Sequence, residues 1–125
     1  MLFDSDVLIF ALRGSSAAQQ AIDSEHDPAV SVVTCMELLM GARDRQDARE
    51  IRVLLNAVPF GIIPLSEDIG HRATIYMEEY GLRSGLDVPD ALIAATAMEH
   101  GLTLCTGNQK HFRVIADLDL RPFRA

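Results

Sequence analysis

Two aspartates interrupt the apolar opening of the chain, MLFDSDVLIF. An ionised carboxylate is costly in apolar surroundings unless it is paired or bound to a cation, so Asp4 and Asp6 need partners. Two further acids, Glu37 and Asp90, follow shortly after apolar segments in the sequence. Carboxylate oxygens suit hard divalent cations such as Mg²⁺ or Mn²⁺. Such ions activate bound water and neutralise phosphate oxygens, so these acids are candidates for metal-assisted hydrolysis.

Helix caps are the alternative interpretation of the acids. Thr34 and Glu37 fit a capping box, in which Thr34 is the N-cap and Glu37 reaches back to its amide. Asp6 has the position of an N-cap for the first helix, and Asp87 is interpreted first as the cap of a later one. Asp4 is expected to differ, because it ends a buried strand and has no helix of its own to cap.

The acids have to be positioned by alternating strands and helices. Connections between the strands are too long for hairpins, which predicts a mainly parallel sheet covered on both faces, a three-layer α/β/α sandwich. In such sheets, ligands bind beyond the carboxyl ends of the strands, where the acids gather. Strands are expected over residues 1–4, 29–34, 60–65, 102–106 and 120–123, helices over 7–13, 16–24, 35–44, 43–58, 66–82 and 88–100, and a turn at GNQKHF.

The composition is that of a single α/β domain, which we expect to span residues 1–125. No secretory signal is recognisable, and no apolar run approaches the roughly 20 residues that span a bilayer. We therefore expect a cytoplasmic protein. Cys35 and Cys105 are expected to be reduced and buried. The formal net charge is −7 and Lys110 is the single lysine. A nucleic acid is therefore a plausible partner only if metal ions supply positive charge at the site.

Four motifs, FDSDVLI, SVVTCMELLMGA, PDALIAATA and TGNQKHF, occur in an order and spacing that resemble the PIN domain, and most closely the VapC toxins of toxin–antitoxin pairs. The resemblance covers nearly the whole chain. It implies a compact α/β/α sandwich whose acidic pocket binds Mg²⁺ or Mn²⁺ and cuts RNA. By position, the implied catalytic residues are Asp4, Glu37, Asp90 and Asn108, and Thr106 matches the family's hydroxyl residue two positions before Asn108.

Two positions depart from the family pattern. The family often has Asp-Thr-Asn or Asp-Thr-Ser where this chain has Asp4-Ser5-Asp6. Ser5 keeps the hydroxyl as a supporting group, whereas Asp6 adds a carboxylate and is a possible further metal ligand. Asn108 is a neutral ligand, which would leave a second metal site weak. The implied reaction uses metal-activated water and no side-chain nucleophile.

The resemblance also implies partners. These are an RNA substrate, a cognate antitoxin whose basic segment enters the acidic pocket, and a second copy in a homodimer. Lys110, His111 and Arg43 are weak candidates for contacts with RNA phosphates. The arginines of the segment RDRQDAREIR alternate with acids, which favours a solvated, salt-paired helix face over a phosphate-binding one.

Two other functions fit parts of the sequence. FDSDVLI is similar to the opening motif of haloacid-dehalogenase-type phosphatases, in which Asp4 would be the nucleophile and Asp6 the general acid. That family needs a Lys or Arg before its late acids, and the single lysine comes after them. The other alternative is a non-catalytic interaction module that retains a relic acidic pocket.

Overall fold

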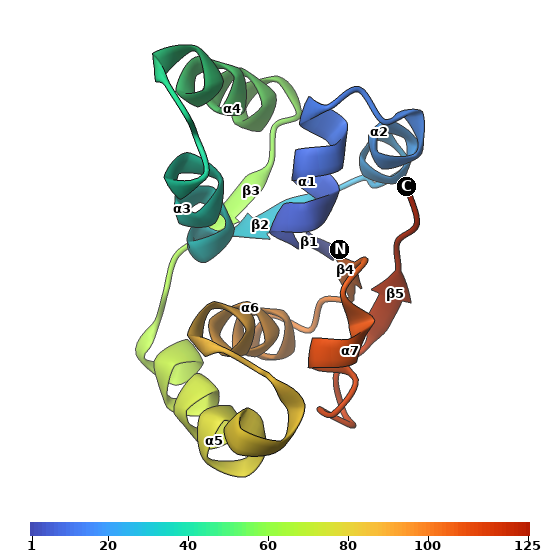
Figure 1. Ribbon diagram of the computed structural model, residues 1–125. Helices are drawn as coiled ribbons and strands as arrows, with labels where there is room; N and C mark the ends of the chain where they lie inside the picture. The colour runs from blue at the N-terminus through green and yellow to red at the C-terminus, as the bar shows by residue number, and fades with distance from the viewer.

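A parallel sheet of five strands forms the centre of the computed structural model, which describes residues 1–125 (Figure 1). The strand order is β3-β2-β1-β4-β5, and every neighbouring pair is parallel. The first strand of the chain is therefore the central one, and all five carboxyl ends lie at one edge, as predicted. The strands are β1 (Leu2–Phe3), β2 (Ala29–Ser31), β3 (Gly61–Ile63), β4 (Leu104–Thr106) and β5 (Leu120–Pro122).

Helices cover both faces of the sheet (Figure 1). One face carries α1 (Ser5–Leu12), α2 (Ser16–Asp23), α3 (Val32–Met40) and α4 (Arg45–Ala57). The other carries α5 (Glu67–Ser84), α6 (Val88–Glu99) and the short α7 (Gln109–Phe112). None of these helices has the length and apolar character that spanning a bilayer requires.

The sheet divides the core in two, because successive side chains of a strand point to opposite faces. Leu2 and Leu104 pack with the apolar side chains of α5 and α6. Their neighbours Phe3 and Cys105 pack with those of α1, α2 and α3. The three inner strands, β1, β2 and β4, are thus buried on both sides, which explains their largely apolar sequences, whereas the edge strands β3 and β5 are more exposed. The predicted three-layer arrangement is confirmed.

Local signals in the sequence set several element boundaries correctly. Ser66 caps α5 by accepting a hydrogen bond from the Ile69 amide at 3.2 Å. Asp87 caps α6, as expected, by accepting from the Asp90 amide at 3.0 Å. Gly14, just past α1, has φ 87°, a left-handed conformation that favours glycine.

Two predicted elements are wrong in part. The strand expected over residues 29–34 ends at Ser31, because Ser31 caps α3 and the β-branched residues after it, Val32 to Thr34, form the first turn of that helix. The segment GNQKHF, expected to be a turn, contains the helix α7. Its Phe112 is fully buried against the α5–α6 core, so tertiary packing stabilises a helix too short to persist alone.

Candidate metal-binding active site

Asp4 lies at the centre of the carboxyl edge of the sheet, directly after β1, and its side chain is almost completely buried (6% exposed). One carboxylate oxygen, Oδ1, accepts a hydrogen bond from the Ser5 amide at 2.8 Å. The other, Oδ2, accepts from the Thr106 hydroxyl at 2.8 Å. Thr106 Oγ1 in turn accepts from the Asn108 amide at 3.0 Å. The end of β4 thereby holds both the Asp4 carboxylate and the backbone of the Asn108 loop.

The expectation that Asp4 caps no helix is wrong. Asp4 is the N-cap of α1, because that helix begins at Ser5, immediately after the strand, with no intervening loop. Ser5 and Asp6 are consequently the first two residues of the helix and neither is its cap. One carboxylate therefore combines a structural role with a candidate catalytic one.

Asp6 links α1 to the loop after β4. Its Oδ2 accepts a hydrogen bond from the Gly107 amide at 2.8 Å. The approach is so close that a Cβ atom on Gly107 would lie 2.8 Å from this oxygen and 3.3 Å from the Phe123 carbonyl oxygen. Asp6 Oδ1 is buried and has no hydrogen-bond partner. Asp6 thus fixes the loop with one oxygen and leaves the other available to a cation or proton.

Glu37 reaches the site from within α3, not from its first turn. The capping-box prediction is wrong, since α3 begins at Val32 and its N-cap is Ser31, whose hydroxyl accepts from the Val33 amide at 3.1 Å. The Thr34 hydroxyl is buried without a partner. Glu37 Oε1 is likewise buried and unpaired, although a carboxylate oxygen normally finds a donor when it leaves water. Glu37 therefore caps nothing and is free to ligate.

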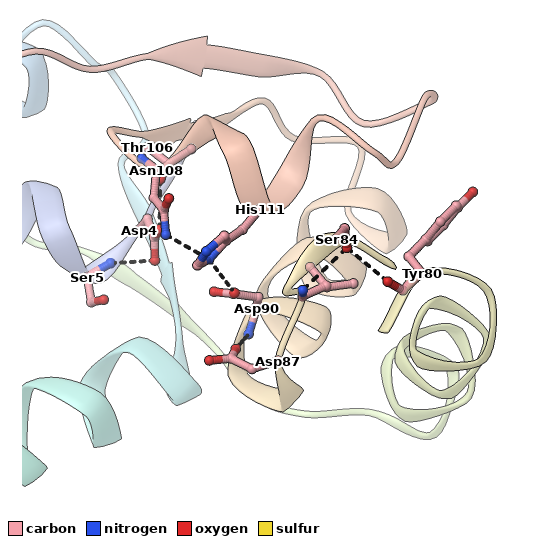
Figure 2. A network of polar contacts seen from close by, with 10 residues as sticks. Asp4, Ser5, Tyr80, Ser84, Asp87, Asp90, Thr106, Asn108 and His111 are labelled. Carbon is pink, nitrogen blue, oxygen red and sulfur yellow. Dashed lines mark hydrogen bonds and ion pairs between the residues drawn. The ribbon is translucent and has the colours of Figure 1, made fainter. Parts of the chain in front are cut away.

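Asp90 and Asn108 meet through a histidine (Figure 2). His111 Nδ1, on α7, lies 3.1 Å from Asp90 Oδ2 and 2.8 Å from Asn108 Nδ2. A protonated Nδ1 donates to Asp90, whereas an unprotonated Nδ1 accepts from Asn108, so the ring cannot satisfy both neighbours at once as they are oriented. Asp87, the cap of α6, adds a further carboxylate beside Asp90.

Burial and mutual repulsion make these carboxyls hard to ionise. Burial raises the pKa of Asp4, and burial together with the charge of Asp4 raises the pKa of Glu37 and raises that of Asp6 to about 6. Burial and the neighbouring Asp87 raise the pKa of Asp90 to about 7. Hydrogen bonds from Thr106 and Ser5 oppose these effects at Asp4. The four acids predicted from the motifs thus influence one another in one electrostatically strained site.

Comparison with known proteins identifies the family. The family model described as PIN domain matches residues 1–118. The chain belongs to the PIN domain family.

Within the PIN domain family, the relatives are VapC proteins. The chain is 38% identical over 122 residues to a protein named Ribonuclease VapC10 from Mycobacterium tuberculosis, with 94% of this chain and 90% of that protein covered. It is 31% identical over 132 residues to Ribonuclease VapC1 from Rickettsia felis, with 96% and 93% covered. A toxin–antitoxin complex from Klebsiella pneumoniae contains a chain with TM-score 0.81 and 35% identity, with 99% and 98% covered. The family resemblance drawn from the motifs is confirmed.

The fold is also shared with more distant structures. The crystal structure of VapBC2 from Rickettsia felis bound to a DNA fragment contains a chain with TM-score 0.84 at 21% identity, with 98% of each chain covered. This likeness supports the three-layer architecture alone. A haloacid-dehalogenase-type phosphatase, the alternative suggested by FDSDVLI, is excluded by the family match. Its late acids should also follow a strand, whereas Asp90 lies in the first turn of α6.

The carboxylates of this PIN domain fit a hard divalent cation in chemical type. Asp6 Oδ1 and Glu37 Oε1 are buried acceptors without donors, and burial and the charge of Asp4 raise the pKa of both groups, so a cation would favour their ionised forms. No three His, Cys, Asp or Glu side chains are already close enough together to hold one ion. Coordination would therefore require these side chains to draw together around the cation.

The three residues predicted as weak phosphate contacts, His111, Arg43 and Lys110, have different surroundings in the structure. His111 was a weak candidate for a phosphate contact, but its ring contacts Asp90 and Asn108. The spacing of Asn108 and His111, one turn of helix apart, was the signal, and it was hidden because the segment was expected to be a turn. Arg43 donates from Nε to Asp47 at 2.9 Å, which is the salt-paired interpretation, and Lys110 takes part in no ion pair.

Proposed function

We propose that the protein is a VapC-type ribonuclease that hydrolyses RNA phosphodiester bonds with Mg²⁺ or Mn²⁺, and that it acts in the cytoplasm as the toxin of a type II toxin–antitoxin pair. The observation that carries the proposal is the set of carboxyls at the carboxyl edge of the sheet, two with buried oxygens that lack donors. The similarity to Ribonuclease VapC10 supports the same activity.

Asp4, Glu37 and Asp90 would hold the metal, and Asp6 and Asn108 are further candidate ligands. A bound Mg²⁺ or Mn²⁺ would lower the pKa of a coordinated water and neutralise charge on the phosphate. Thr106 keeps Asp4 in place through its hydroxyl, and Ser5 adds its amide. The surrounding fold excludes bulk water from Asp4 and leaves the buried Glu37 Oε1 without a hydrogen-bond donor, so that this oxygen could bind the metal.

A cleavage assay tests the activity. RNA should be cut in Mg²⁺ or Mn²⁺ and left intact in EDTA. Asp4→Asn and Asp90→Asn should each slow cleavage by orders of magnitude, since each removes the charge of a metal ligand. The matched control is Asp23→Asn, which removes an exposed carboxylate at the end of α2 and should leave the rate unchanged. Cleavage that persists in EDTA would exclude the metal mechanism, and a catalytically silent protein would favour the non-catalytic module.

A basic antitoxin is the proposed inhibitor. The similar chain from Klebsiella pneumoniae belongs to a toxin–antitoxin complex, and the buried acids of this site would attract an inserted Arg or Lys. Expression of the chain alone should arrest growth, and expression of the Asp4→Asn form should not. Equal harmlessness of both would contradict the toxin assignment but not the ribonuclease assignment. The homodimer implied by the family resemblance stays a prediction.

A further inference from the structure

Three arginines on α4 form a basic stripe without acidic partners. Arg45, Arg49 and Arg52 follow one another at intervals of four and three residues, which places them on one face of the helix. All three are exposed. None takes part in an ion pair; the four ion pairs of the structure join the Met1 amino group to Glu25, Arg43 to Asp47, Arg72 to Glu99 and His111 to Asp90.

The acids of the same helix are engaged elsewhere. Asp44 caps α4 by accepting from the Asp47 amide at 2.9 Å, and Asp47 itself binds Arg43. Glu50 accepts from Gln46 Nε2 at 3.3 Å. The salt-paired helix face expected from the sequence therefore forms at Arg43 alone, and the arginine stripe keeps its full charge.

The stripe surrounds a shallow hollow of about 360 Å³ lined by Arg45, Ala48, Arg49 and Arg52. Ala48 has the smallest side chain of the four and leaves room for an anion between the guanidinium groups. Guanidinium groups present planar forks of donors that match phosphate oxygens. At 1.5 Å per residue the stripe is about 10 Å long, roughly the rise of three nucleotides at about 3.4 Å each.

The stripe faces away from the acidic site. Asp47, Glu50 and Ile51 lie on the opposite side of α4, where they line a groove that also contains Glu37. A short oligonucleotide seated at Glu37 would therefore not reach the arginines. An RNA that extends past α4 would meet them, which matters in a protein whose net charge of −7 otherwise repels nucleic acid.

We propose that Arg45, Arg49 and Arg52 bind the phosphate backbone of an RNA outside the cleavage site. The inference rests on the proposed ribonuclease function, because that function supplies the polyanion. The stripe makes no distinction between bases, since phosphate contacts fix position and not sequence. The stripe therefore favours an RNA that extends past α4 over an oligonucleotide that ends at the acidic site.

Binding in EDTA separates this surface from catalysis. The affinity of a fluorescently labelled single-stranded RNA is measured by anisotropy over a range of salt concentrations. Each phosphate contact contributes about 0.7 to the slope of log affinity against log salt for a single strand. The triple variant Arg45→Gln, Arg49→Gln, Arg52→Gln should therefore have a slope whose magnitude is smaller by about 2. The corresponding triple Arg→Lys variant should keep the slope, because it keeps the charge.

The matched control removes three other exposed arginines, Arg113, Arg121 and Arg124, by substitution with Gln. It lowers the net charge equally, so an equal loss of slope in both glutamine variants, or no loss in either, would overturn the proposal. Displacement of the RNA by poly-glutamate as readily as by unlabelled RNA would also overturn it, and would assign the stripe to an acidic protein. Wild-type cleavage in Mn²⁺ is measured separately, so a failure of the ribonuclease assignment is distinguishable from a failure of the stripe.

Discussion

At the scale of single residues, Asp4 combines the role of a helix cap with that of a candidate metal ligand. It caps α1 through Oδ1 and receives the Thr106 hydroxyl on Oδ2, so its geometry is fixed before any ligand arrives. Its burial raises its pKa, which means that the folded chain holds this charge at a cost. A cap needs only a hydrogen-bond acceptor, whereas a metal ligand also benefits from negative charge. Substitution of Asp4 by Asn therefore separates the two roles.

Asp4→Asn should leave the metal-free protein as stable as the wild type or more stable. Asn caps helices about as well as Asp, and it carries no buried charge. The same variant should respond less to Mn²⁺, because a metal that binds only the folded state raises the melting temperature by an amount that grows with the ratio of its concentration to its dissociation constant. Thermal melts of both proteins with and without Mn²⁺ measure this. If Asp4→Asn melts lower and still responds fully to metal, Asp4 is structural and the site assignment is wrong.

The residue types of the site could be predicted from the sequence, but their contacts could not. Asp4, Glu37, Asp90 and Asn108 stand in motifs with characteristic spacing, so their identity as candidates came from the order of residues alone. The ring of His111 reaches Asp90 only because α7 forms and packs on α6, which is a tertiary effect. Nothing in the local sequence specifies that contact.

At the scale of elements, the beginning of α3 decides what Glu37 can do. The sequence offered Thr34 as the cap and Glu37 as its partner, but the helix begins earlier, at a serine that ends the strand. Val32 and Val33 were interpreted as strand residues because their β-branched side chains favour strands. Burial of Val33 against the α5–α6 core overrides that preference. Glu37 is thereby moved into the interior of the helix, facing the site.

Two substitutions test which residue caps α3. Ser31→Ala should lower the free energy of unfolding by about 1 kcal/mol, the usual cost of a lost N-cap. Thr34→Val should leave it unchanged or raise it by about 1 kcal/mol, because the buried Thr34 hydroxyl has no partner to lose. Urea denaturation of the two variants and the wild type provides the comparison. If Thr34→Val were less stable than Ser31→Ala, the result would support Thr34 as the cap of α3.

The loop after β4 should tolerate no side chain at position 107. Gly107→Ala would place a Cβ atom 2.8 Å from Asp6 Oδ2 and 3.3 Å from the Phe123 carbonyl, and we expect it to lower the free energy of unfolding by roughly 1–3 kcal/mol. Gly70→Ala, in α5, is the matched control. Apart from its chain neighbours and the backbone of α5, no atom lies within 4 Å of its added Cβ, and the substitution should stabilise the protein by about 0.5–1 kcal/mol. An equally harmless Gly107→Ala, measured by the same denaturation, would show that Asp6 does not hold the loop.

At the scale of the whole molecule, the architecture was the most predictable feature. Alternating strands and helices with long connections permit few arrangements other than a parallel sheet covered on both sides, and the structure has that form. The order of the strands, with β1 at the centre, was not predicted, because strands of two or three buried residues carry no information about their neighbours. That order brings Asp4 beside Thr106.

The site should make the stability of the metal-free protein depend on pH. Folding raises the pKa of Asp6 to about 6 and that of Asp90 to about 7, so the folded state binds protons more tightly than the unfolded chain. The free energy of unfolding should therefore fall as pH rises from about 4 to about 7.

Chemical denaturation in EDTA at several pH values measures this dependence. Mn²⁺ should reduce the fall, since it replaces the proton as the source of positive charge, and it should stabilise the protein less at pH 5 than at pH 7 because protons compete for the same oxygens. Asp90→Asn should flatten the profile, whereas Asp23→Asn, at an exposed position, should not. A stability that is constant from pH 4 to 7 in EDTA would mean that the acids do not share one site.

The hydrogen bond between Thr106 and Asp4 joins residues 102 positions apart. Chains are synthesised from the N-terminus, so a ribosome makes Thr106 102 residues after Asp4. Until β4 has left the ribosome and inserted beside β1, Asp4 has no hydroxyl donor, and the loop that carries Asn108 is not held beside it. A growing chain of this protein therefore emerges beside messenger, transfer and ribosomal RNA before the contacts that hold Asp4 and the Asn108 loop together can form.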